Sequence, residues 1–238
     1  MPPNHPVSPW LSVVIPTLNE AGTLPACLAC LYAEAKQAGR FEVIIADGGS
    51  TDNTVELAGA YPAVTVIHST RGRAKQLNAG ARQARGTHLW FLHADTLPPA
   101  GWSQHLQNAV AQGTPATFSV HFSNQASSAL LRFYSRGSRL NHWSVRFGDQ
   151  SLFVARAVFL KLGGYREDHV LMEGHELARR LIKTTGLRVL PAAVTTSSRR
   201  YQQFGVVYTQ AVFTLIFCLY YLGTGQKRLV KLYRKAFR

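Results

Sequence analysis

Acidic residues are scarce in this 238-residue chain, which has 12 Asp and Glu against 26 Lys and Arg, and a formal net charge of +14. Such an excess of positive charge predicts an anionic partner: nucleic acid, a phosphorylated substrate or an acidic membrane. Signatures of nucleic-acid binding are missing as well, because the chain has neither zinc-finger spacing nor the aromatic motif of ribonucleoprotein domains. We therefore expect no nucleic-acid binding, which leaves the phosphorylated substrate and the membrane.

Cysteine is also rare, since Cys27, Cys30 and Cys218 are the whole complement. An odd number excludes a fully paired disulfide framework, and the opening stretch MPPNHPVSPW lacks the apolar core of a signal peptide. We therefore expect a reducing, cytoplasmic compartment. Cys27 and Cys30 form a C-x-x-C without a second pair of metal ligands, and their helical pattern favours core packing over a zinc site.

The chain does contain a regular alternation of short β-branched runs with helical patterns. Strands that alternate with helices form a mostly parallel sheet covered on both faces, so the sequence predicts an α/β fold. Pro16 is expected to end the first strand, and Gly39 to close the first helix. The expected strands are 11–15, 41–47, 64–68 and 87–95, and the expected helices are 24–38, one that opens near residue 52, and 72–84.

The loops after these strands carry a large share of the few acids. Glu20, Asp47, Asp52 and Asp95 all lie at strand ends. In a parallel sheet, ligands bind beyond the carboxyl ends of the strands, so these loops should form a binding site. Two structural alternatives remain, since Asp52 can cap the following helix and Asp47 can shape its turn.

Several segments together resemble the family-2 glycosyltransferases. VVIPTLNE and VIIADGGSTDNT are similar to the opening of that family, GRAKQLNAGARQARGTHLWFLHADT to its third helix and metal-binding strand end, and FGDQSLFVARAVFLKLGGY to its acceptor side. With LMEGHELARRL, the similarity covers about residues 11 to 190. The resemblance implies a three-layer, Rossmann-like GT-A fold and a small, membrane-associated member of bacterial type.

The resemblance also implies a nucleotide-sugar donor, and the residue chemistry agrees with it. The carboxylate of Asp47 can accept the N3 hydrogen of uracil, while Gly48 permits close approach of the backbone. The side chain of Arg73 can reach the diphosphate. The expected donor-binding residues are Thr17, Glu20, Asp47, Gly48, Ser50, Arg73, Gln76 and Asp95.

A divalent cation would neutralise the diphosphate, and Asp95 is its expected protein ligand. The family often has Asp-x-Asp at this strand end, whereas this chain reads His93-Ala94-Asp95. His93 is therefore either a second metal ligand or a packed strand residue. An imidazole ligand would favour manganese over magnesium.

Glycosyl transfer needs a base that removes the hydroxyl proton of the acceptor. The resembled family usually supplies it from a Glu-Asp pair before a helix, but here Glu173 is followed by Gly174. Glu173 is the expected base, and His175 is an alternative because its ordinary pKa is about 6.5. Asp149 is a further candidate, or else a turn residue. Residues 123–146 mix aromatic and basic side chains and are expected to cover the acceptor.

The C-terminal part differs in character, and we expect a catalytic domain at 10–198 and a helical segment at 199–238. Residues 204–222 are apolar but short and interrupted by polar side chains, which disfavours a membrane span. Residues 227–238 have the pattern of a basic interfacial helix, the alternative being a helix packed on the catalytic domain. We therefore expect an anionic membrane surface as partner at the cytoplasmic face, or else a soluble cytoplasmic protein.

The resemblance thus implies an inverting glycosyltransferase that moves a sugar from a nucleotide-diphosphate donor, expected to be a UDP-sugar, to a lipid or other membrane-associated acceptor. The alternative, which rests on Gly174, is a catalytically lapsed module that only binds nucleotide sugars. A nicotinamide-dependent enzyme is excluded, because no G-x-G-x-x-G follows the first strand. Oligomeric state is left open.

Overall fold

The protein is described by a computed structural model covering residues 8–61, 63–123 and 128–238. The N-terminal stretch that lacks a signal-peptide core falls largely outside the described residues, as does part of the segment predicted to cover the acceptor. The strands are β1 (Leu11–Thr17), β2 (Phe41–Asp47), β3 (Val64–His68), β4 (His88–Phe91), β5 (Thr96–Leu97), β6 (Ala116–Phe122), β7 (Leu152–Ala155) and β8 (Arg188–Thr196).

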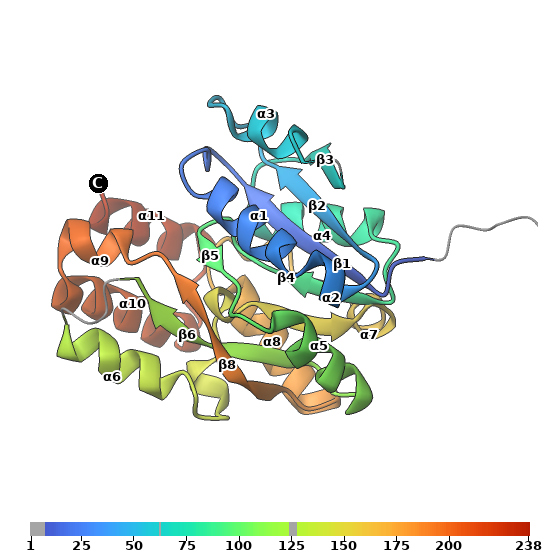
Figure 1. Cartoon of the computed structure of the whole chain (residues 1–238). Coiled ribbons are helices and arrows are strands. Elements are labelled where there is room, and N and C mark those ends of the chain that lie inside the picture. Colours follow the sequence, from blue (N-terminus) through green and yellow to red (C-terminus); the bar gives the residue numbers. More distant parts are fainter. Residues whose placement is uncertain (1–7, 62, 124–127) are drawn as a thin grey trace, which may run out of the picture.

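These strands form one sheet in the order β3-β2-β1-β4-β7-β6-β8-β5 (Figure 1). Strands β1 to β4 pair in parallel, and β7 joins them to β6 through antiparallel pairing on both of its sides. Strand β8 is parallel to β6 and antiparallel to the short β5. The predicted α/β fold with a mostly parallel sheet is confirmed.

Helices cover both faces of this sheet and give it three layers. One core contains buried side chains of α1 and α5, and the other contains those of α4, α7 and α8. Strand β1 contributes side chains to both cores, because Val13 and Ile15 point into the first core and Val14 points into the second. The helices are α1 (Leu24–Ala33), α2 (Ala35–Ala38), α3 (Thr54–Gly59), α4 (Arg73–Gln83), α5 (Trp102–Ala111), α6 (Ala129–Gly137), α7 (Arg156–Lys161), α8 (Glu173–Thr184), α9 (Arg199–Phe204), α10 (Val206–Tyr221) and α11 (Gln226–Ala236), with the short 3-10 helices η2 (Trp143–Val145) and η3 (Gly148–Gln150).

The first strand is longer than predicted, because it passes through Pro16 and ends at Thr17. Its pairing with β4 stops at Val14, so beyond that residue one side of β1 is open and a proline costs no ladder bond there. The strand predicted at 87–95 is shorter, since β4 ends at Phe91 and the chain then turns. Cys27 is fully buried in the core, as its helical pattern predicted.

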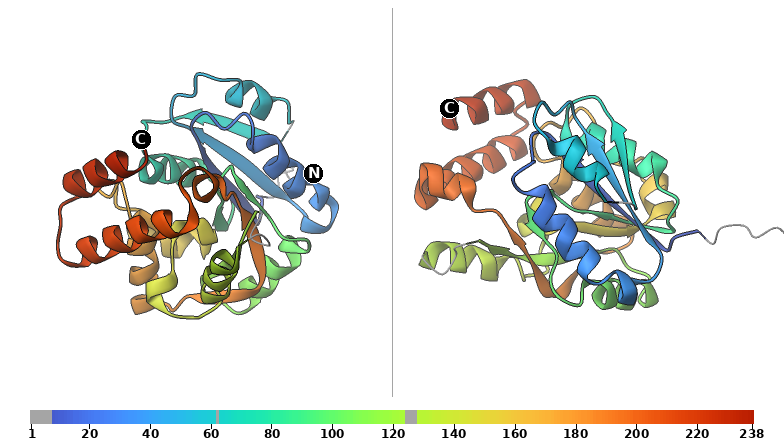
Figure 2. Two further views of the ribbon diagram at one scale, coloured as in Figure 1. Left: turned by 90° about the vertical axis from the view of Figure 1, so that its left-hand side faces the viewer. Right: turned by 45° about the horizontal axis from the view of Figure 1, so that its top comes forward.

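The C-terminal helices α9, α10 and α11 gather on the side toward which β1, β2, β6 and β8 point (Figure 1), and Figure 2 shows the same grouping from two other directions. Helix α10 has 16 residues, and within the described residues no helix is both long and apolar enough to cross a membrane.

The apolar face of the helix predicted at 227–238 packs on α10, inside the same C-terminal segment, and the prediction of a basic interfacial helix stays a prediction. Leu229 is fully buried against Val212 and Ile216 of α10. Leu232, Tyr233 and Ala236 are partly buried against the same cluster. The apolar face of α11 therefore contacts protein, which removes apolar surface from water.

Candidate active site

Asp47, at the end of β2, organises the loop that follows it. Its carboxylate accepts hydrogen bonds from the backbone N–H groups of Gly49 and Ser50, both at 2.9 Å, and from the hydroxyl of Thr17 at 3.1 Å. Burial raises the pKa of Asp47, but the hydrogen bonds from Ser50, Gly49 and Thr17 outweigh it, so the pKa lies below its ordinary value. The structure thus brings Thr17, Asp47 and Ser50 together, with Asp47 in the turn-shaping role.

The loops after β1 and β2 are tied to each other by side chains. Asn19 accepts from the N–H of Thr51 at 2.8 Å and has a φ of 56°, a left-handed conformation that Asn tolerates. Asp52 accepts from the N–H groups of Ala21 and Thr54, both at 3.1 Å, which confirms its predicted place before α3. The sequence analysis missed Asn19; an Asn in a loop beside a strand end was the available signal.

Glu20 turns its carboxylate away from the loop after β2. Its Oε2 accepts from the hydroxyl of Thr23 at 2.7 Å, and its Oε1 lies 4.0 Å from Nη2 of Arg199. Its backbone N–H donates to the hydroxyl oxygen of Thr54 at 2.8 Å, so the main chain of Glu20 joins the loop after β1 to the start of α3.

Gln76 lies beneath these loops, not beside an open cavity. Its Nε2 donates to the carbonyl oxygens of Thr17 and Ala46, both at 2.8 Å, and the residue is buried. A Cβ atom on Gly48 would lie 3.0 Å from the Gln76 amide, tighter than nearly all real contacts. Gly48 is therefore small because Gln76 packs against it, and Gln76 holds the ends of β1 and β2 in register.

Arg73 and Glu173 join the donor half of the molecule to the predicted catalytic helix. Nη1 of Arg73 lies 3.0 Å from Oε1 of Glu173, and the two residues are separated by 100 positions. Glu173 is almost fully buried, whereas the side chain of Arg73 is 53% exposed. The Glu173 carboxylate raises the pKa of Arg73. Glu173 is thus engaged by a cation that also faces solvent.

His175, on α8, packs against α10. Its Nδ1 lies 2.8 Å from the carbonyl oxygen of Arg146, and its Nε2 lies 2.6 Å from the hydroxyl of Tyr221. The ring also stacks on Phe147. Burial lowers the pKa of His175. Both ring nitrogens therefore already have partners.

Asp149, in η3, has a carboxylate oxygen without a partner. Among the described residues, Oδ1 of Asp149 is buried and receives no hydrogen bond. Burial, opposed by the charge of Arg73 and assisted by that of Asp95, raises the pKa of Asp149 to about 6. An unpaired carboxylate that titrates near neutrality is the kind of group that functional sites contain.

Gly174 explains how Asp149 comes to lie at the start of α8. A Cβ atom at residue 174 would be 2.7 Å from Cα and 2.9 Å from N of Gly148, so the two glycine backbones are in direct contact. This contact seats η3 against the first turn of α8. Asp149 is brought to the helix start at which the family resemblance leads us to expect an aspartate after Glu173.

His93 and Asp95 follow β4 and lie next to this group. A Cβ atom on Gly148 would be 3.8 Å from Nε2 of His93. Burial and the charge of Arg73 lower the pKa of His93 to about 3, so its imidazole is neutral. Among the described residues, the Asp95 carboxylate accepts a long hydrogen bond, of 3.4 Å, from the hydroxyl of Thr96.

These residues fit a hard cation that takes most of its ligands from a diphosphate. The described part of the chain holds no cluster of three or more His, Cys, Asp or Glu that could bind a metal alone. Asp95 does supply a carboxylate with spare acceptor capacity, and His93 a neutral imidazole.

The sequence is similar to that of curated glycosyltransferases. The PGL/p-HBAD biosynthesis glycosyltransferase of Mycobacterium bovis is 39% identical over 94 residues, which cover 37% of this chain and 36% of that protein. The undecaprenyl-phosphate 4-deoxy-4-formamido-L-arabinose transferase of Pseudomonas paraeruginosa is 32% identical over 134 residues, covering 53% and 39% of the two chains. The aligned part thus spans less than two fifths of these relatives.

Solved structures show the same fold. A mannosyltransferase from Pyrobaculum calidifontis, in complex with GDP-Man and Mn²⁺, superposes with a TM-score of 0.65 at 21% identity and covers 88% of this chain and 62% of its own. S. aureus TarS 1-349 in complex with UDP-GlcNAc gives 0.61 at 19% identity, with coverages of 79% and 58%. Residues 12–159, more than half of the chain, match the family described as glycosyl transferase family 2. The chain therefore belongs to this family and has the GT-A fold.

Proposed function

We propose that this protein is an inverting glycosyltransferase that moves a sugar from a nucleotide-diphosphate donor, a UDP-sugar, to a hydroxyl of a membrane-associated acceptor. The observation that carries the proposal is that, among the described residues, Oδ1 of the buried Asp149 carboxylate has no partner, near the Arg73–Glu173 pair. A single in-line displacement at the anomeric carbon inverts its configuration, and it requires one base and one stabiliser of the leaving diphosphate.

Asp149 supports the role of base better than the two other candidates. Glu173 is neutralised by Arg73 at 3.0 Å, and both nitrogens of His175 are engaged. Asp149 retains an oxygen that can accept a proton, and its pKa of about 6 lets it act as a carboxylate at neutral pH. In this proposal Glu173 positions Arg73.

Arg73 and Asp95 support the handling of the leaving group. Half-exposed and anchored by Glu173, the guanidinium of Arg73 can bind a diphosphate oxygen without a large loss of side-chain entropy. Asp95, with His93, would hold a divalent cation, manganese or magnesium, which when bound would neutralise charge on the diphosphate.

A membrane-associated acceptor is supported by the surface of α10 and by one relative. Val207 on α10 and Leu222 directly after it are 74% and 79% exposed, and residues 227–238, which include most of α11, carry six cations. Exposed apolar side chains bordered by cations favour an anionic lipid surface. The Pseudomonas relative is named for transfer to undecaprenyl-phosphate. We place the protein at the cytoplasmic face of the membrane.

A panel of nucleotide sugars, with and without Mn²⁺, tests the donor. The cognate donor should raise the melting temperature because it binds only the folded state. In Asp95→Asn, the Mn²⁺-dependent part of the donor affinity should fall about 10-fold or more, since one ligand oxygen is lost without a change in volume. Unaltered Mn²⁺ dependence in this variant would exclude Asp95 as the ligand. Donor binding without turnover on any acceptor would instead identify a lapsed binding module.

Replacement of Asp47 tests how the base of the donor is recognised. Asp47→Ala should weaken nucleotide binding by about 1 to 3 kcal/mol, because a charged hydrogen-bonding group is lost from the loop. Isothermal titration with UDP and GDP distinguishes two roles. A larger loss for UDP would indicate contact with uracil, whereas equal losses would leave Asp47 with its turn-shaping role alone.

A further inference from the structure

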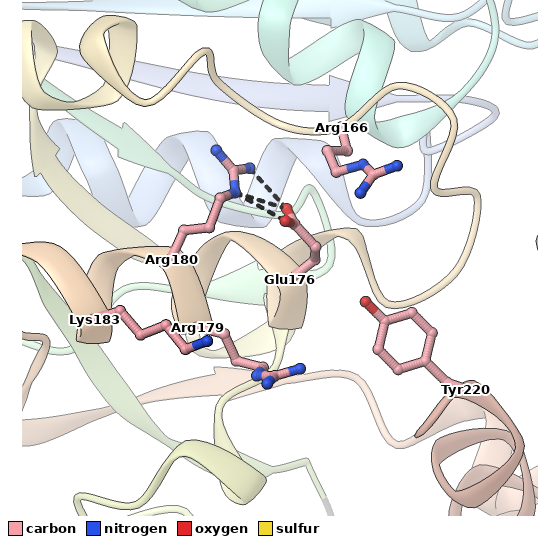
Figure 3. Close-up of a pocket in the computed structure, with 6 residues that line it drawn as sticks. All are labelled: Arg166, Glu176, Arg179, Arg180, Lys183 and Tyr220. Atoms are coloured by element: carbon pink, nitrogen blue, oxygen red, sulfur yellow. Dashed lines mark hydrogen bonds and ion pairs between the residues drawn. The ribbon is translucent and has the colours of Figure 1, made fainter. Parts of the chain in front are cut away.

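A polar cavity of about 260 Å³ opens along helix α8 (Figure 3). The helix contributes residues at spacings of three and four positions, which share one face. The lining side chains are Arg166, Glu176, Arg179, Arg180, Lys183 and Tyr220. Four cations therefore surround a single carboxylate.

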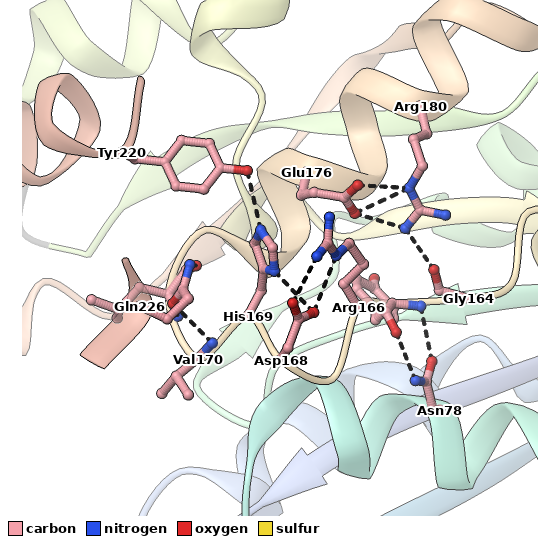
Figure 4. A network of polar contacts seen from close by, with 12 residues as sticks. Asn78, Gly164, Arg166, Asp168, His169, Val170, Glu176, Arg180, Tyr220 and Gln226 are labelled. Carbon is pink, nitrogen blue, oxygen red and sulfur yellow. Dashed lines mark hydrogen bonds and ion pairs between the residues drawn. The ribbon is translucent and has the colours of Figure 1, made fainter. Parts of the chain in front are cut away.

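That carboxylate is already neutralised by one of the four cations. Nε and Nη2 of Arg180 donate to Glu176 at 2.9 and 2.7 Å (Figure 4). The same guanidinium donates to the carbonyl oxygens of Leu162 at 2.6 Å and Gly164 at 2.7 Å. These contacts hold the guanidinium of Arg180 in place at the edge of the cavity. The positive charge of Arg180 is balanced by the negative charge of Glu176.

Arg166 is balanced by an acid just outside the lining. Its Nε and Nη2 donate to the two carboxylate oxygens of Asp168 at 3.1 and 2.7 Å (Figure 4). This fork-to-fork geometry uses one edge of the guanidinium and leaves Nη1 for a ligand.

Arg179 and Lys183 carry the uncompensated charge. Among the described residues, neither has a carboxylate within ion-pair distance. The guanidinium of Arg179 lies over the rings of Trp143 and Tyr221, at 5.6 and 5.1 Å from their centroids, which restricts its orientation. The cavity therefore has an excess of two positive charges, which matches the dianion of a phosphate monoester.

We propose that this cavity binds a phosphate monoester group, separately from the diphosphate of the donor. Arginine forks bind phosphate oxygens through paired N–H···O bonds, and Lys183 adds a mobile ammonium at the rim. Tyr220 comes from α10, whereas the cations come from α8 and the loop before it, so a bound phosphate joins α10 to the catalytic part. The phosphate belongs either to a lipid headgroup or to a soluble molecule.

The experiment compares two double variants of the full chain that remove the same charge. Arg179→Gln/Lys183→Gln changes the cavity, and Lys36→Gln/Arg40→Gln changes two exposed cations near α2. Glycerol phosphate, measured by titration calorimetry, probes the soluble source. Sedimentation with phosphatidylcholine vesicles that contain phosphatidic acid probes the lipid source. We expect the cavity variant to weaken binding of one probe about 10-fold or more and the control to leave it nearly unchanged.

Loss confined to the cavity variant with glycerol phosphate supports a soluble ligand, and loss confined to it with vesicles supports a lipid headgroup. Equal loss in both double variants, or no binding of either probe by the unchanged protein, overturns the proposal. The single variant Lys183→Gln changes an exposed residue, so it should fold normally. Its affinity for the probe should fall as well, but less than that of the double variant. An Arg73→Gln variant that loses glycerol phosphate binding while the cavity variant keeps it would assign the phosphate to the donor site and also overturn the proposal.

Discussion

Asp149→Asn should lower the turnover of sugar transfer by about a hundredfold or more, the usual scale for loss of a general base, while donor affinity changes little. The amide has the same volume as the carboxylate but cannot accept the proton of the acceptor hydroxyl. Rates of transfer at saturating donor and acceptor measure turnover, and titration calorimetry measures donor affinity. If Asp149→Asn turned over normally and Glu173→Gln lost its rate with donor affinity intact, Glu173 would be the base instead.

The pH dependence gives Asp149 a second signature. With its pKa at about 6, turnover of the unchanged protein should rise as pH increases through 6 and then level off. The variant should lack this step, because its residual rate no longer depends on that ionisation. A step near 6 that persists in Asp149→Asn would belong to another group.

Stability should change in the opposite direction to activity. The pKa of Asp149 is raised by folding from 3.8 to about 6, so the protonated form is favoured in the folded state, and this stabilisation is lost as pH rises through 6. Asp149→Asn should therefore raise the free energy of unfolding by about 1 to 3 kcal/mol at neutral pH. The gain should shrink toward pH 4. Denaturant unfolding at both pH values measures it.

Gly174→Asp should destabilise the protein by about 3 kcal/mol or more and abolish transfer, although it restores the Glu-Asp pair common in the family. A Cβ atom at this position would lie 2.7 Å from the Cα of Gly148, and backbone cannot move aside as a flexible side chain does. Displacement of η3 would also carry Asp149 away from the site. Denaturant unfolding and the transfer assay measure the two effects.

Two alanine variants provide a matched control for this contact. Gly174→Ala should also destabilise, even though alanine normally favours a helix by about 1 kcal/mol over glycine. Gly148→Ala should be tolerated, because its Cβ would meet nothing closer than 3.8 Å. If Gly174→Ala stabilised the protein, the close contact of the two backbones would be refuted.

Local patterns predicted most of the fold because strands and helices are set by neighbouring residues. The strand at 64–68 was predicted to the residue, and the helix predicted at 72–84 forms as Arg73–Gln83. The place of Asp52 before α3 followed from the preference of short polar side chains for helix starts.

Contacts between distant segments could not be predicted in this way. The residues around Gly174 do not indicate that Gly148 packs on it. The ion pair between Arg73 and Glu173 likewise joins segments that are 100 residues apart in the sequence. The amphipathic pattern of residues 227–238 did show an apolar face, but the identity of its partner depends on where α10 lies. Periodicity reveals that a face is buried, not what buries it.

The two sides of helix α10 differ in what they contact. Its inner side presents Phe217 and Tyr221 to the ring of His175, so substitutions there disturb the contact between α10 and α8. Its outer side, with Val207 and Leu222, contacts little of the protein. Substitution of Val207 should therefore leave the surroundings of His175 unchanged, whereas substitution of Phe217 should alter them.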